Sequence, residues 1–152
     1  MQPVPPMHAR APEPGTDLYT FMVRSHQHLD DLYGQLLAAM EANAPDVCAV
    51  WTEFEHELRT HMEAEERFVL PSFATVDASE ARSLVREHGV IREQLLEIGV
   101  AIDLHQARYA RALDLVERLR AHAGREDHLL YRWADKHLDD ALVAAALAHA
   151  SR

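Results

Sequence analysis

Apolar residues recur every three or four positions in four long segments of the chain, which is the pattern of helices that each bury one face. These segments cover residues 18–41, 47–70, 81–102 and 112–133. The connections between them are short, and amphipathic helices joined by short loops pack as neighbours that run in opposite directions. The pattern therefore predicts an all-α fold, an antiparallel up-and-down four-helix bundle.

The ends of these segments carry recognisable signals. Thr16 or Asp17 can cap the first helix, and Pro71 is expected to end the second. The fourth helix is expected to be continuous, with an inward stripe of Ala112, Leu115, Leu119, His122, Glu126, Leu129 and Trp133. Residues 138–150 are rich in alanine and are predicted to form a short fifth helix.

The start of the chain has a different composition. Residues 1–15 hold the prolines Pro3, Pro5, Pro6, Pro12 and Pro14. Such a stretch is predicted to be a flexible, extended tail. Residues 16–152 are expected to form a single domain, because that length suffices for one real hydrophobic core.

Charge and composition narrow the class of protein. The formal net charge of −10 argues against a nucleic acid or an anionic membrane surface as partner. No stretch is apolar and long enough to span a bilayer, and residues 1–15 lack the apolar core of a secretion signal. The one cysteine, Cys48, cannot form an internal disulfide, which fits a reducing compartment. We therefore expect a soluble, cytoplasmic protein.

Ionisable residues interrupt the apolar stripes in two copies of one pattern. The first copy is His26 followed by His61 and Glu65, and the second is His88 followed by His122 and Glu126. In each H-x-x-x-E pair, the spacing of four residues puts the imidazole and the carboxylate on one helix face, one turn apart. Four imidazoles and two carboxylates arranged in this way are typical of a two-metal site.

The four histidines are also expected to lie at one level of the bundle. His26 and His61 are each roughly 17 residues, or about 26 Å of helix, from the turn near residue 43. His61 and His88 are nearly equidistant from the next connection, and His88 and His122 from the last one. The centres of the three connections therefore all predict that the four histidines lie in one layer of the bundle.

A histidine on an apolar stripe is usually an ordinary core or boundary residue, so His26 and His88 taken singly would not decide the matter. Glu65 and Glu126 are more informative, because a carboxylate is almost never buried without a compensating partner. A pair of cations would provide that compensation. Imidazole and carboxylate ligands suit iron, manganese or zinc.

Several other residues compete for a place in this site. His28 could exchange with His26 if the helix rotated slightly, and Tyr33 faces inward one heptad later. The acidic residues Asp30, Glu57 and Glu87 could accept hydrogen bonds from ligand imidazoles, although a solvated face is the favoured interpretation for each. An apolar shell is expected from Leu29, Leu58, Ile91 and Leu119.

Together these motifs resemble a known family. The order is His26, then His61-x-x-x-Glu65-Glu66 with Leu70-Pro71, then Glu87-His88, then His122-x-x-x-Glu126-Asp127 with Leu130-Tyr131. This order resembles the hemerythrin HHE cation-binding family over about residues 18–136. The resemblance implies a non-haem di-iron centre, two Fe ions joined by an oxo, hydroxo or water bridge. It also implies that the four histidines are terminal ligands and that the two glutamates are bridges.

The sequence departs from the oxygen-carrying hemerythrins at two points. Those proteins have a second histidine one turn after the first on the third helix, where this chain has Arg92, and they use H-x-x-x-x-D on the fourth. The resemblance is therefore to hemerythrin-like proteins that bind or sense O₂, NO or peroxide, with an unidentified signalling or redox partner. A peroxide-decomposing di-iron enzyme and a structural, metal-stapled bundle remain as alternatives.

Overall fold

The computed structural model describes residues 17–152, and the predicted proline-rich tail, residues 1–15, lies outside the described residues. Within the described part, the chain forms helices joined by short turns and contains no strand. The all-α prediction is therefore confirmed. None of the helices within residues 17–152 combines the length and the apolar character needed to cross a bilayer.

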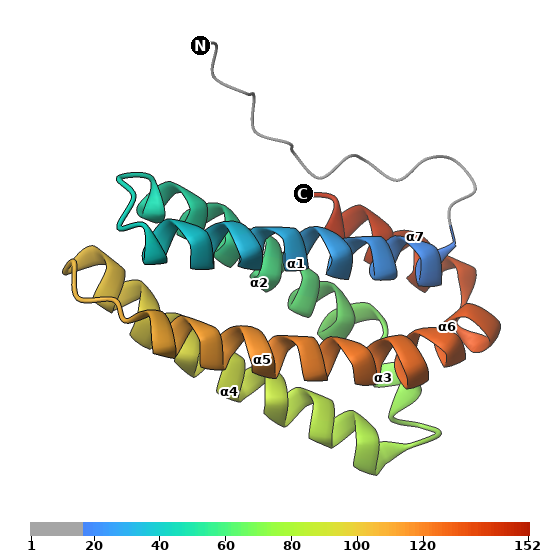
Figure 1. The fold of residues 1–152 in the computed structure, drawn as a ribbon. Helices are drawn as coiled ribbons and strands as arrows, with labels where there is room; N and C mark the ends of the chain where they lie inside the picture. The colour runs from blue at the N-terminus through green and yellow to red at the C-terminus, as the bar shows by residue number, and fades with distance from the viewer. Residues whose placement is uncertain (1–16) are drawn as a thin grey trace, which may run out of the picture.

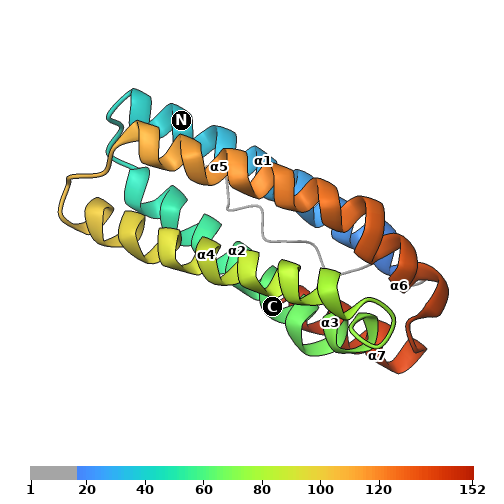
Figure 2. The same ribbon diagram turned by 90° about the horizontal axis from the view of Figure 1, so that it is seen from below.

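Four long helices make up most of the molecule and lie side by side along its length (Figures 1 and 2). They are α1 (Leu18–Glu41), α2 (Val47–Phe68), α4 (Ala78–Asp103) and α5 (Tyr109–Arg125). Helix α1 packs against α2 and α5, and α4 packs against α2 and α5. The carboxylate of Asp17 caps α1 by accepting a hydrogen bond from the Thr20 backbone amide at 2.6 Å, so Asp17 is the capping residue.

Two turns with left-handed residues close one end of the molecule. Asn43, with φ of 49°, lies between α1 and α2, and His105, with φ of 55°, lies between α4 and α5. Figure 1 shows both turns at the same end, opposite α3, α6 and α7. Inward-facing residues of different helices that lie at equal distances from this end of the bundle can therefore meet in its interior.

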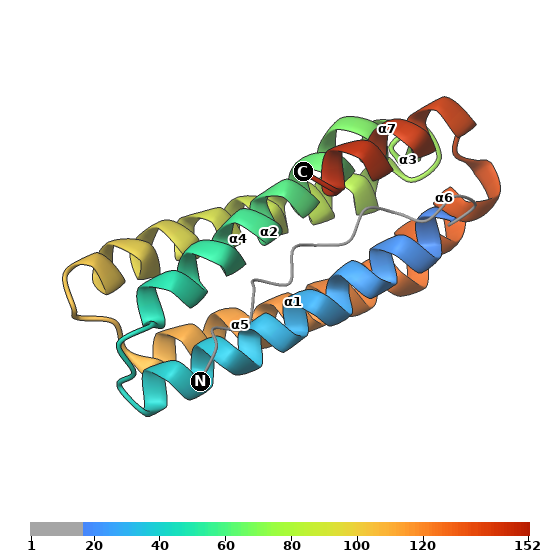
Figure 3. The same cartoon turned by 90° about the horizontal axis from the view of Figure 1, so that it is seen from above.

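Short elements close the other end. They are α3 (Leu70–Phe73), the π-helical turn η1 (Glu126–Leu130), α6 (Tyr131–His137) and α7 (Asp140–Ala150). Helix α7 is the predicted fifth helix, and it packs against α2 (Figure 3). Helix α2 ends at Phe68, and Pro71 lies in the first turn of α3, where its missing N–H is tolerated. Pro71 therefore lies inside a short helix, and the long helix has already ended three residues before it.

The fourth predicted helix is not continuous, and this changes which of its residues face inward. The π-helical turn carries i→i+5 hydrogen bonds, so it holds more residues per turn than an α-helix and shifts the phase beyond it. Leu129, expected inside, is 50% exposed, whereas Leu130 and Tyr131 are fully buried. Trp133, also expected inside, is half-buried against Phe73 at the edge of the core.

The hydrophobic core has two parts. One extends toward the two left-handed turns and includes Leu29, Leu58, Ile91 and Leu119. The other, toward α3 and α6, includes Leu18, Met22, Val69, Leu70, Leu84, Leu130 and Tyr131. The layer between these clusters holds the histidines and glutamates singled out in the sequence.

Candidate metal centre

All six predicted ligands converge in the layer between the two core clusters. They form two groups whose candidate ligand atoms lie within 4.8 Å of one another. One group is His26, His61, Glu65 and Glu126, and the other is His88, His122, Glu65 and Glu126. We call these groups position 1 and position 2. Glu65 and Glu126 belong to both, which is the arrangement that two bridging carboxylates require.

The two shared glutamates are among the most buried residues of the chain, with exposures of 0% for Glu65 and 1% for Glu126. Glu65 Oε1 lies 2.5 Å from His61 Nε2, and Glu126 Oε1 lies 3.3 Å from both His26 Nε2 and His122 Nε2. The other oxygen of each glutamate has no hydrogen-bond partner. A buried carboxylate oxygen without a partner is costly, and a cation between these residues would satisfy it.

A hydrogen-bonding side chain holds the outer nitrogen of each imidazole. Asp127 bonds His26 Nδ1, Glu66 bonds His88 Nδ1 and Ser25 Oγ bonds His61 Nδ1, each at 2.8 Å. Glu87 makes a short contact with His122 Nδ1. Carboxylates such as Asp127, Glu66 and Glu87 are usual outer partners of metal-binding histidines, since they accept from Nδ1, orient the ring and leave Nε2 for the metal.

His88 and His122 show how well the donor set fits a cation. Their Nε2 atoms face one another at 2.9 Å. A carboxylate can only accept a hydrogen bond, so Nδ1 of each ring carries the proton that bonds Glu66 or Glu87. The facing Nε2 atoms then both present lone pairs, and this contact requires a proton or a metal ion.

A scan against protein-family models matches residues 17–149 to the hemerythrin HHE cation-binding domain. This match covers most of the chain. The protein belongs to the hemerythrin HHE cation-binding family. No match was found among curated proteins or among solved structures.

One contact of this hemerythrin-family site was missed from the sequence. Tyr131, fully buried, places its hydroxyl 2.5 Å from Glu65 Oε1, 2.9 Å from His61 Nε2 and 3.1 Å from His26 Nε2. A continuous α-helix would have turned this residue away, because it lies five positions after Glu126. The π-helical turn brings it inward. The sequence did contain a signal for this contact, because the Leu130-Tyr131 pair belongs to the motif that resembles the family.

The outer acceptors were also mostly missed. Glu87 was expected on a solvated face, and this was wrong, because it is half-buried and bonds His122. Asp30 is exposed and pairs with Arg120 instead. The sequence did contain a usable signal, since Glu66 directly follows Glu65 and Asp127 directly follows Glu126.

Arginines fix two of these acceptors. Arg92 forms a two-pronged ion pair with Glu66, at 2.7 and 2.8 Å. The position at which oxygen-carrying hemerythrins have an extra histidine is therefore used here to hold an acceptor. Arg125 contacts Glu87 and also Glu80, the latter at 2.6 Å. Burial raises the pKa of Glu66, but the hydrogen bonds from His88 and Arg92 outweigh this and lower it to about 2.

The carboxylates change the proton affinity of the imidazoles. Burial lowers the pKa of His26 and His88, but hydrogen bonds and charges from the surrounding carboxylates outweigh it. The pKa of His26 is raised to about 10 and that of His88 to about 11. Burial also raises the pKa of Glu126, yet contacts with Glu65, His122 and His26 lower it overall. Without metal, the protonated imidazoles of His26 and His88 therefore offset negative charge from the surrounding carboxylates.

Burial and the nearby carboxylates raise the pKa of Tyr131, so its hydroxyl keeps its proton and donates to Glu65. Tyr33 has a different place. It is buried, packs edge-to-face on Phe54 with ring centroids 5.2 Å apart, and has no hydrogen bond to the six residues. Tyr33 is thus a packing residue beside the site.

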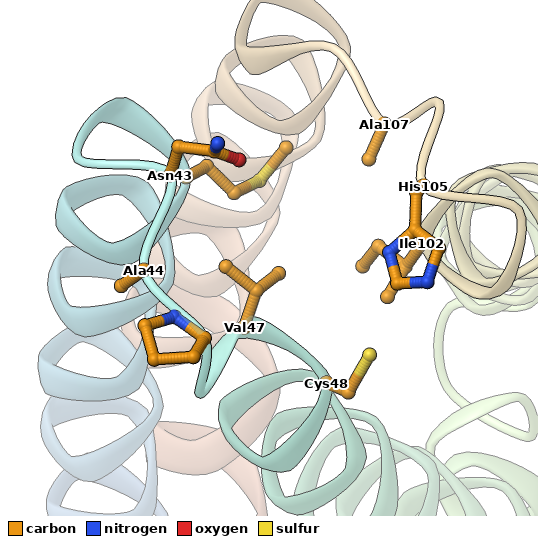
Figure 4. A pocket seen from close by; sticks show the side chains of 9 residues that line it. Asn43, Ala44, Val47, Cys48, Ile102, His105 and Ala107 are labelled. Atoms are coloured by element: carbon orange, nitrogen blue, oxygen red, sulfur yellow. The ribbon is translucent and has the colours of Figure 1, made fainter.

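The remaining histidines of the described chain lie outside the cluster. His28 is half-buried and absent from both ligand groups, whereas His56, His128 and His137 are exposed. His149 is buried and pairs with Glu63 at 3.1 Å, away from the cluster. His105 lines a pocket near Cys48 at the turn end (Figure 4). His8 lies outside the described residues.

A small cavity adjoins the cluster on the side of the left-handed turns. Its volume is about 10 Å³, and the four predicted shell residues, Leu29, Leu58, Ile91 and Leu119, line it together with Tyr33. His26, His61, His122 and Glu126 form its polar wall. A space of this size holds about one water-sized molecule, so it is too small for an organic substrate.

Proposed function

We propose that this protein is a non-haem di-iron member of the hemerythrin family that binds or senses O₂, NO or peroxide. The four long helices would form the up-and-down antiparallel bundle of the family. His26 and His61 would be terminal ligands of one iron, and His88 and His122 of the other. Glu65 and Glu126 would bridge them. The observation that carries the proposal is that both carboxylates belong to both ligand groups.

When bound, the two irons would supply electrons and an open position for a small ligand. The residues of the chain would orient the ligands, balance the charge and limit access to the site. The carboxylates of Glu66, Glu87 and Asp127 orient the imidazoles, and the buried glutamates supply compensating negative charge. The apolar cavity excludes bulk water and limits the size of the ligand.

Iron fits this donor set because imidazole and carboxylate ligands suit iron, as they also suit manganese and zinc, and no thiolate lies in the cluster to select a softer metal. The resemblance to the hemerythrin family favours iron among the three. Cys48, the only cysteine of the chain, is exposed and away from the site. A cytoplasmic location fits this single free thiol. A redox or signalling partner would then relay the state of the metal pair.

The test is the visible spectrum and the iron content of the protein purified in air, followed by dithionite and then peroxide. We expect two irons per chain, bands that dithionite bleaches, and about one equivalent of peroxide or NO consumed per site. Many peroxide turnovers per site would instead indicate a peroxide-decomposing enzyme. Zinc in place of iron, with no response to dithionite, would indicate a structural site.

A further inference from the structure

The two halves of the metal centre differ in how free their carboxylate oxygens are. Glu65 Oε2 and Glu126 Oε2, the two buried oxygens without a partner, both lie near position 2. They are 3.3 Å and 3.6 Å from Nε2 of His88, which is itself fully buried. A cation at position 2 could therefore bind these two carboxylate oxygens without breaking a hydrogen bond.

At position 1 a side chain outside the ligand set already engages the donors, whereas the inner nitrogens at position 2 contact each other and the shared glutamates. The Tyr131 hydroxyl donates to Glu65 Oε1 at 2.5 Å and lies within 3.1 Å of the inner nitrogens of both His61 and His26. A cation that binds there must displace this hydroxyl from three of its four ligands. By position in the repeated motif, Tyr131 corresponds to Leu70, since each lies five residues after a shared glutamate. Leu70 has no polar side-chain atom, so the obstruction exists on one side only.

The side chains that hold the outer imidazole nitrogens also favour metal binding at position 2 over position 1. At position 2, both imidazoles are held by carboxylates that arginines fix in place, Glu66 by Arg92 and Glu87 by Arg125. At position 1, His61 is held by the Ser25 hydroxyl. A hydroxyl can donate or accept, so it neither fixes the tautomer of His61 nor raises its basicity as a carboxylate does.

We propose that the two positions are unequal: metal fills position 2 first and binds it more tightly, and the Tyr131 hydroxyl weakens binding at position 1. This inference rests on the proposed function, because it requires a two-metal site. It assigns Tyr131 the role of a positioning residue rather than a ligand. Tyr131 does not line the small apolar cavity, so its effect is on metal loading rather than on ligand access.

The experiment is a calorimetric and optical titration of chelator-treated protein with Co²⁺ under argon, repeated with Fe²⁺. We expect two binding steps whose affinities differ by about tenfold or more, the range that outer partners of metal ligands produce. Tyr131→Phe should strengthen the weaker step at least several-fold and leave the stronger step within about twofold. Tyr33→Phe is the matched control, because Tyr33 is also buried but has no hydrogen bond to the ligands.

His26→Ala and His88→Ala assign the two steps. His26→Ala should lose only the weak step, and His88→Ala should lose the strong one, with circular dichroism confirming that both variants fold. Two equal steps in the unmodified protein would overturn the inference while leaving the di-metal site intact. A weaker second step in Tyr131→Phe would also overturn it, since Tyr131 would then be a ligand. Failure to bind a second ion in the unmodified protein would instead refute the proposed function, and this inference with it.

Discussion

Each imidazole of the candidate metal centre has its inner nitrogen close to the shared carboxylates, and its outer nitrogen is hydrogen-bonded to another side chain. The inner contacts bring opposite charges together, and the outer ones orient the rings. At the scale of single residues, most side chains of the site contact one another, so the replacement of one is expected to disturb its neighbours. Glu65 and Glu126 matter most, because each belongs to both ligand groups.

Removal of either shared carboxylate should abolish the two-metal site. Glu65→Ala or Glu126→Ala is expected to retain less than about one metal per chain, because each removes a ligand from both positions and leaves imidazolium charge uncompensated. Inductively coupled plasma analysis of purified protein measures this. Glu93→Ala, an exposed change on α4, is the control and should keep the full metal content. A variant at Glu65 or Glu126 that still holds two metals would refute its bridging role.

His26 and His28 offer a second test at this scale. Only His26 belongs to a ligand group, and its Nδ1 bonds Asp127 at 2.8 Å. His26→Ala should therefore lose much of the bound iron, whereas His28→Ala should keep it. Iron content and the visible spectrum of the two variants give the answer. Equal depletion in both, or depletion in His28→Ala alone, would mean that α1 presents a different face to the site.

The six candidate ligands could be predicted from the sequence because two local rules acted together. Helical spacing put His61 next to Glu65, and equal distances from the turns put the four histidines in one layer. The outer acceptors could not be predicted in the same way. The contact between Asp127 and His26 joins residues on different helices, and it depends on packing that periodicity does not encode.

At the scale of elements, the π-helical turn between α5 and α6 has the largest consequence. It was not predicted, because a stripe read at 3.6 residues per turn carries no sign of a wider turn. It leaves Glu126 in phase with α5 and rotates the following residues so that Tyr131 enters the site. π-helical turns inside α-helices are frequent at functional sites, and this one lies directly beside the candidate ligands.

The phase shift can be tested by stability measurements on neighbouring leucines. Leu130 is fully buried, and Leu130→Ala should lower the free energy of unfolding by about 2–5 kcal/mol. Leu129 is 50% exposed, and Leu129→Ala should change it by less than about 1 kcal/mol. Urea denaturation of both variants decides the point. The reverse order would mean that the helix continues regularly and that Leu129 faces the core.

At the scale of the whole molecule, the candidate metal centre lies between the two clusters of the hydrophobic core, so the stability of the fold depends on how the buried charges are balanced. Two carboxylates with almost no exposure must be compensated by protons or by metal ions. The same residues would therefore determine both the stability of the protein and the proposed metal binding.

Stability of the metal-free protein should fall as the pH rises above neutrality. The folded-state pKa values of His26 and His88, about 10 and about 11, lie above the ordinary value of 6.5. Their stabilising contribution is therefore complete below about pH 6.5 and is lost as the pH rises toward 10–11, at no more than about 1.4 kcal/mol per pH unit for each histidine. Urea denaturation with a chelator between pH 7 and 9.5 measures this.

The metal-loaded protein is the control for this pH dependence, because bound metal replaces the protons on the imidazoles. Its stability should change little over the same range. Stability of the metal-free protein that stays constant or rises from pH 7 to 9.5 would contradict the account. It would mean that other groups balance Glu65 and Glu126.

The central claim is that one chain holds two irons bridged by Glu65 and Glu126. The most direct measurement is the Mössbauer spectrum of protein loaded with ⁵⁷Fe and oxidised in air, taken together with the iron content of the same sample. The account predicts two irons per chain whose spins are coupled to a diamagnetic ground state, with different quadrupole splittings for positions 1 and 2. One iron per chain, or two irons that behave as isolated paramagnetic ions, would contradict it.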